Sequence, residues 1–144
     1  MLKYTLDYTC TPAANPTTIF QVLAGSAVYV HITGIDLSLR GASPATAPVP
    51  FDWVVQSTAG TMTSQTPVRQ DRGLTKTISS TCTVNATVEP GGNTPTIWVC
   101  SLHQQATLYW RPVFPIRLEP SERVGLRYRS STYVEVAFTI YLEE

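Results

Sequence analysis

Few residues in the chain are suited to binding a metal ion. The histidines are His31 and His103, and no second histidine lies near either of them in the sequence. A histidine-based centre needs two or more ligands with a helper carboxylate, so we expect no metal and no cofactor. Three cysteines at long spacings, Cys10, Cys82 and Cys100, provide neither a disulfide framework nor a zinc ligand pair. We expect them to be small buried apolar groups in a reducing compartment.

Hydrolytic chemistry also lacks its usual residues. A serine hydrolase of the α/β type needs a Gly-x-Ser-x-Gly turn before a helix, and the sequence has neither. Asp52 and Glu135 could be assigned as the two catalytic carboxylates of a glycosidase, but any β-rich chain offers two such carboxylates. No phosphate-binding loop is present. The sequence therefore predicts a protein that is not an enzyme.

Arginine and aromatic residues are better represented than lysine, and this bias is typical of protein interfaces. Two segments are candidate contact regions. Ser57–Lys76 is predicted to be a long polar loop, and Ala106–Pro115 is predicted to be irregular and aromatic. The 109–114 run either contacts a partner or folds its aromatic rings over the end of its own domain. The candidate partner-contact residues are Arg69, Arg72, Tyr109, Trp110, Arg111 and Phe114.

A second group of arginines lies on one face of a predicted strand. Arg123, Arg127 and Arg129 alternate with apolar residues, and Arg117 precedes them. We interpret them as an exposed face whose charges discourage edge pairing, with an acidic patch on a partner as the alternative. The formal net charge of zero argues against nucleic acid, for which a strongly basic face is expected.

Strand-like alternation of polar and apolar residues dominates the chain, and no segment has a helical pattern. A one-residue slip in the apolar phase at Thr33–Gly34 predicts a β-bulge in a long bent strand. Such a pattern predicts an all-β, antiparallel, jelly-roll-like β-sandwich of about eight strands forming one domain over residues 1–144. The predicted strands are Leu2–Thr9, Thr17–Leu23, Ala27–Leu39, Phe51–Gln56, Thr81–Val88, Ile97–His103, Pro115–Leu118, Arg123–Arg129 and Tyr133–Leu142.

Composition adds an expectation about assembly. Charged residues make up 14% of the 144 residues, against about 25% in a typical soluble protein. A lightly charged, neutral chain has little charge repulsion against self-association, so we expect a homo-oligomer. No apolar run approaches the length of a membrane span, and the alternating first ten residues are not typical of a signal peptide. We expect no membrane partner.

The order of these features resembles the small jelly-roll cement, or decoration, proteins of tailed-bacteriophage capsids. The resemblance implies a non-catalytic subunit on the virion surface, made in the host cytoplasm, often trimeric and bound to the major capsid protein. No functional residue is carried over, because that group has no shared ligand motif. The segments that carry the resemblance are Val28–Gly41, Thr66–Arg72, Thr81–Pro90, Ile97–His103, Trp110–Pro112, Arg123–Arg127 and Ala137–Glu144.

An alternative function is a phage fibre or tail-associated jelly-roll domain that binds host carbohydrate or another virion protein. In that case Trp53, Trp98 or Trp110 would serve as the stacking platform for a sugar. These tryptophans lie in different predicted segments, with no cluster of carboxylate and amide residues beside them in sequence.

Overall fold

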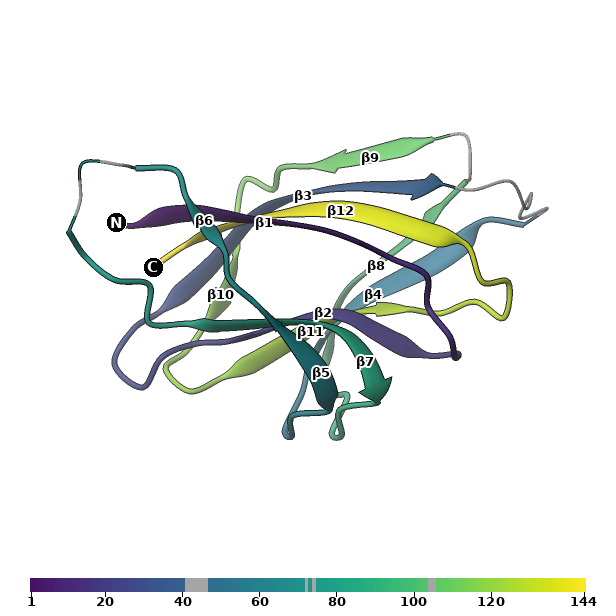
Figure 1. Ribbon diagram of the computed structural model, residues 1–144, viewed down its shortest axis with the longest axis horizontal. Helices are drawn as coiled ribbons and strands as arrows, with labels where there is room; N and C mark the ends of the chain where they lie inside the picture. The colour runs from purple at the N-terminus through teal and green to yellow at the C-terminus, as the bar shows by residue number, and fades with distance from the viewer. Residues whose placement is uncertain (41–46, 72, 74, 104–105) are drawn as a thin grey trace.

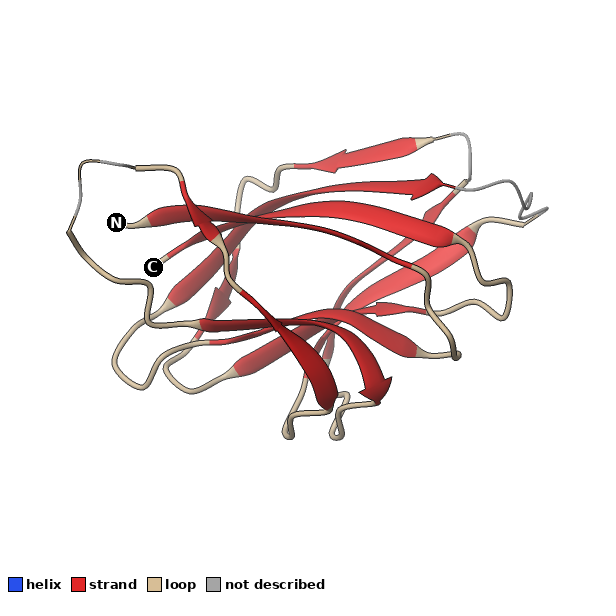
Figure 2. Cartoon of the chain, viewed as in Figure 1, coloured by secondary structure: helices blue, strands red, loops and turns tan. Residues whose placement is uncertain are grey.

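The computed structural model describes residues 1–40, 47–71, 73, 75–103 and 106–144, and these form strands, turns and loops without a helix (Figures 1 and 2). No helix capable of crossing a membrane occurs in this part of the chain. Two antiparallel six-stranded sheets face one another, and a single hydrophobic cluster fills the space between them. The prediction of an all-β sandwich is confirmed.

Sheet A has the order β10-β3-β12-β1-β6, with β9 also paired to β3. Sheet B has the order β5-β7-β2-β11-β4-β8. The strands of sheet A are β1 (Lys3–Cys10), β3 (Val30–Arg40), β6 (Val68–Arg69), β9 (Thr107–Trp110), β10 (Ile116–Leu118) and β12 (Glu135–Glu143). The strands of sheet B are β2 (Thr17–Leu23), β4 (Val49–Val55), β5 (Thr61–Gln65), β7 (Thr81–Val88), β8 (Thr96–Leu102) and β11 (Arg123–Tyr128).

The connectivity is that of a jelly roll with one insertion. The chain alternates between sheets through β1, β2, β3 and β4, and again through β8, β9–β10, β11 and β12. These elements give the neighbours β1-β12-β3-β10 in one sheet and β2-β11-β4-β8 in the other. Between β4 and β8, the inserted strands β5, β6 and β7 extend both sheets beyond β1 and β2.

Two predicted loops contain strands. Ser57–Lys76 was expected to be one long loop but includes β5 and β6, and Ala106–Pro115 includes β9. With the nine segments predicted as strands, they make twelve strands in the described part of the chain, against the prediction of about eight. β5 is rich in Thr, Ser and Gln and mostly exposed, and β6 is only two residues long, so both lack the apolar alternation that marks a strand with one buried face.

Alternation explains the strands that were predicted well. In β12 every second residue is buried along the whole strand, because successive side chains of a strand point to opposite faces of the sheet. The bulge predicted at Thr33–Gly34 is also present. Tyr141 is opposite Gly34 while Leu142 is opposite Ile32, which leaves Thr33 as the extra residue of β3.

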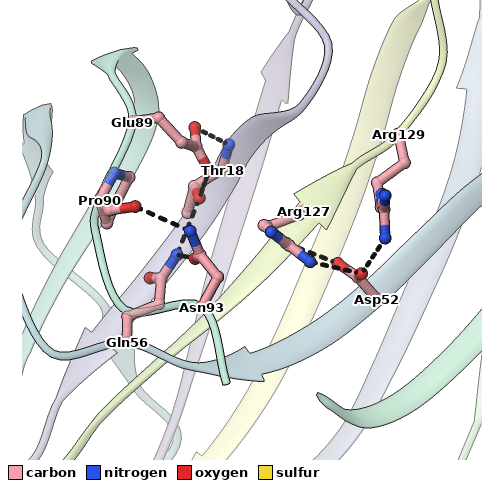
Figure 3. Close-up of polar contacts among 8 residues, drawn as sticks. All are labelled: Thr18, Asp52, Gln56, Glu89, Pro90, Asn93, Arg127 and Arg129. Carbon is pink, nitrogen blue, oxygen red and sulfur yellow. Dashed lines mark hydrogen bonds and ion pairs between the residues drawn. The ribbon is translucent and has the colours of Figure 1, made fainter. Parts of the chain in front are cut away.

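The connection between β7 and β8 crosses sheet B and contacts it through Glu89 and Asn93 (Figure 3). The Gln56 side-chain amide lies over Gly125, where a Cβ atom would clash with it. Its Nε2 donates to Thr18 Oγ1 at 3.0 Å and to Asn93 Oδ1 at 2.8 Å, and its Oε1 accepts from Gln21 at 2.6 Å. This buried polar network fastens the crossing segment to the sheet.

The two ends of the chain are paired with each other (Figure 1). Leu2 and Glu144 exchange both backbone hydrogen bonds, at 2.7 and 3.0 Å. The buried Glu144 carboxylate also accepts from the backbone N–H of Ser79 at 2.7 Å and of Ser80 at 3.1 Å. One side chain therefore joins the end of β12 to the segment that leads into β7.

Glu144→Ala should lower the free energy of unfolding by about 1–3 kcal/mol, because it leaves buried N–H donors without an acceptor. Urea denaturation measures the loss. The neighbouring Glu143→Ala is the matched control, because Glu143 only forms an ion pair with a lysine that is 60% exposed, worth about 0–1 kcal/mol. Equal losses in the two variants would contradict the role assigned to Glu144.

Candidate functional site

The outer face of sheet A carries a hollow of about 750 Å³ that spans four strands. Its shape follows from strand register. One row of cross-strand neighbours consists of small side chains, and the next row is larger and more polar. The small row is Thr107, Ser38, Ala137 and Thr9, and the larger row is Tyr109, Asp36, Thr139 and Asp7. Arg40 also lines the hollow. We call this feature the sheet A groove.

In the larger row, Asp36 is held by Arg111, which lies across Gly34, where a Cβ atom would clash with the guanidinium. Arg111 pairs with Asp36 at 2.7 Å and lies 4.1 Å from the centre of the Tyr141 ring. The Tyr141 hydroxyl donates to Asp36 at 2.8 Å, and this bond, with burial, raises the pKa of Tyr141. Arg111 is therefore engaged within the chain and orients Asp36 at the groove.

A second feature is strand β8, which forms one edge of sheet B. Among the described residues, no strand pairs with its outer side. Its sequence carries no charged residue, and Ile97 and Val99 are exposed on it, Val99 to 62%. Natural edge strands are normally protected by charge, proline or a covering segment, so we call this feature the β8 edge and treat it as a candidate interface.

The predicted contact residues do not form one site. Tyr109 is 71% exposed beside the groove. Phe114 is 87% exposed in the β9–β10 connection, beside the equally exposed Val113. Arg69 lies on β6, at the opposite side of the sandwich, where it lines a smaller hollow of about 400 Å³. Arg72 falls outside the described residues.

The tryptophans do not provide an exposed sugar platform. Trp53 is fully buried in the core. Trp98 of β8 and Trp110 of β9 are partly buried and pack against each other, with ring centres 5.2 Å apart. Their contact joins the two sheets at the β8 edge. Trp110 therefore fits the second interpretation of its segment, in which aromatic rings close the chain's own sandwich.

The expected exposed arginine face is partly buried. Arg127 forms two hydrogen bonds to Asp52, at 2.8 and 2.7 Å, and Arg129 adds a contact at 3.2 Å (Figure 3). The Asp52 side chain is 2% exposed and that of Arg127 is 10% exposed. The expectation failed because a carboxylate on the neighbouring strand neutralises Arg127. Glu135 lies in the other sheet, so the structure does not pair it with Asp52.

The remaining candidates for chemistry are separated. His31 lies on β3 of sheet A, and His103 follows β8 of sheet B. In the part of the chain that the structure describes, no group of three or more His, Cys, Asp or Glu could hold a metal ion. Burial raises the pKa of the Cys82 thiol to about 12 and that of Cys100 to about 11. Both thiols are therefore poor nucleophiles.

Asp52→Ala should destabilise the fold by about 3–5 kcal/mol, because it leaves the buried Arg127 guanidinium without its counter-charge. Arg129→Ala is the control, since Arg129 is 53% exposed and its removal should cost at most about 1 kcal/mol. Chemical denaturation measures both. An Asp52→Ala loss as small as that of Arg129→Ala would show that the pair contributes little.

The cysteines should resist alkylation in the folded protein. At pH 8 only about one Cys100 in a thousand is a thiolate when the pKa is about 11, and the thiolate is the reactive form. Iodoacetamide followed by mass spectrometry should show slow labelling that accelerates in denaturant. Rapid labelling of the folded chain would contradict the raised pKa values.

Comparisons with protein-family models, with curated proteins and with solved structures found no significant match to this chain. The functional argument therefore rests on its own geometry. Three features carry that argument: a polar groove on sheet A, an uncharged open edge at β8, and charged pairs that are satisfied within the fold.

Proposed function

We propose that this chain is a capsid cement protein, a structural virion subunit that binds the assembled phage head and stabilises it. Its partner is the major capsid protein, and it acts as a homo-oligomer, with a trimer as the expected form. The observation that supports the proposal best is the β8 edge. A seven-residue strand without charge is a liability for a free monomer, but it suits a subunit that is covered in its working state.

The chemistry of an open strand edge matches that of a protein partner. Each unpaired N–H and C=O along the edge can join an extended segment of another chain, as in strand addition. Ile97 and Val99 add apolar contacts, and zero net charge leaves little repulsion between neighbouring copies. A major capsid segment or a second copy would contribute the missing strand.

The opposite side of the sandwich is closed, which favours β8 as the docking side. β6 follows β5 directly, so one continuous segment passes from the edge of sheet B to the edge of sheet A (Figure 1). The terminal strand β12 lies between β1 and β3 and has no free edge. Among the edges of sheet B, β8 is therefore the one assigned to a partner strand.

Val99→Lys should abolish retention on phage heads that lack the chain, because it places a charge on the edge that a partner strand must approach. The parent protein should co-sediment with these heads and raise their resistance to heat. At a hundredfold excess over Kd, binding to the assembled state contributes about 2.7 kcal/mol per site. Light scattering of the free variant should also show fewer oligomers.

Val88→Lys is the matched control, since Val88 is 60% exposed but lies on β7, opposite Thr61 of β5 and away from the β8 edge. It should bind and protect heads like the parent. If Val99→Lys folds and still protects heads equally well, the β8 edge is not the docking site. If the parent never co-sediments with heads, the cement function is wrong, and the fibre or tail function replaces it.

A further inference from the structure

We infer that the sheet A groove is a binding site for a neutral oligosaccharide. This inference is independent of the proposed cement function, because it uses the outer face of sheet A and not the β8 edge. It also differs from the alternative predicted from the sequence, since the stacking residue is Tyr109 and not a tryptophan.

The groove has the dimensions of an elongated ligand. It runs from β9 through β3 and β12 to β1, which is three interstrand steps of about 4.8 Å each. Its floor is the row of small side chains, so among the described residues the hollow is fixed by residue size on paired strands. A preformed site on paired strands loses little conformational freedom on binding.

The lining provides hydrogen-bonding groups of both kinds. Hydroxyl groups come from Thr107, Ser38 and Thr9, a carboxylate from Asp7, and a guanidinium from Arg40. Sugar hydroxyls both donate and accept, so a mixture of acceptors and donors suits them. Ala137 is the only small apolar residue of the floor, and the core of a protein interface would need more apolar surface.

Charge selects a neutral ligand over an acidic one. Asp36 is already paired with Arg111, so the exposed charges of the lining are mainly Asp7 and Arg40, which balance each other. Tyr109, 71% exposed at the β9 end, offers a flat ring that can pack on the C–H face of a pyranose while its hydroxyl remains in water.

The test is an array of immobilised oligosaccharides containing neutral hexose oligomers beside sialylated and sulfated ones. The best neutral compound is then titrated into ¹⁵N-labelled protein. Backbone signals of β1, β3, β9 and β12 should shift. Tyr109→Ala should weaken binding about tenfold, a change that corresponds to about 1.4 kcal/mol. Ala137→Leu, which fills the floor, should weaken binding at least as much.

Tyr133→Ala is the control for loss of an exposed tyrosine, because Tyr133 is 48% exposed and does not line the groove. It should bind like the parent, and so should Val99→Lys, whose defect is confined to capsid binding. Circular dichroism verifies the fold of each variant, and Tyr109→Ala alone decides the matter if Ala137→Leu does not fold. No binding at millimolar sugar, binding unaffected by Tyr109→Ala, or binding restricted to acidic glycans would each overturn the inference.

Discussion

The two sheets are held together by side chains at every second position of their strands, which point into the space between the sheets. The rest of the structure depends on this packing. Leu6, Phe20, Trp53 and Phe138 belong to one apolar cluster, with the Phe20 ring 5.9 Å from Trp53 and 6.3 Å from Phe138. Because the inner faces are committed to the core, only the outer faces and the edges can differ in use. The outer face of sheet B is crossed by the β7–β8 connection over a buried polar network, whereas the described residues of sheet A form a groove on its outer face.

The two sides of the sandwich differ in how their strand edges are protected. On the side of β1 and β2, the inserted strands β5–β7 extend both sheets and close the gap between them. On the other side, the Trp98–Trp110 contact seals the interior, but the backbone of β8 remains open in the described part of the chain. Sealing the core and protecting an edge are separate physical requirements, and this side meets only the first.

Strands that carry apolar residues in alternation could be predicted from the sequence, whereas the short, largely polar edge strands could not. β1, β11, β12 and the bulge at Thr33 follow from alternation alone. β5, β6 and β9 are short edge strands whose residues are largely polar or half-exposed, so tertiary pairing and not sequence pattern defines them. The exposure of Tyr109 and the partial burial of Trp110 could have been predicted, because Leu108 and Trp110 share one alternation phase and Tyr109 has the opposite one. The groove and the Asp52–Arg127 pair were missed because both depend on which strands are neighbours, and alternation within one strand carries no such information.

The pairing of Leu2 with Glu144 has a mechanical consequence. β1 and β12 run antiparallel, with Lys3 opposite Glu143 and Cys10 opposite Val136, so both chain ends leave sheet A at the same corner. A force that separates those ends would break the hydrogen bonds between β1 and β12 one after another, starting at the chain ends. It would not shear all of these bonds at the same time. Tension applied at the corner would therefore peel the sheet at low force. The same force applied at the side of the sandwich, away from the chain ends, would be distributed over several strands at once.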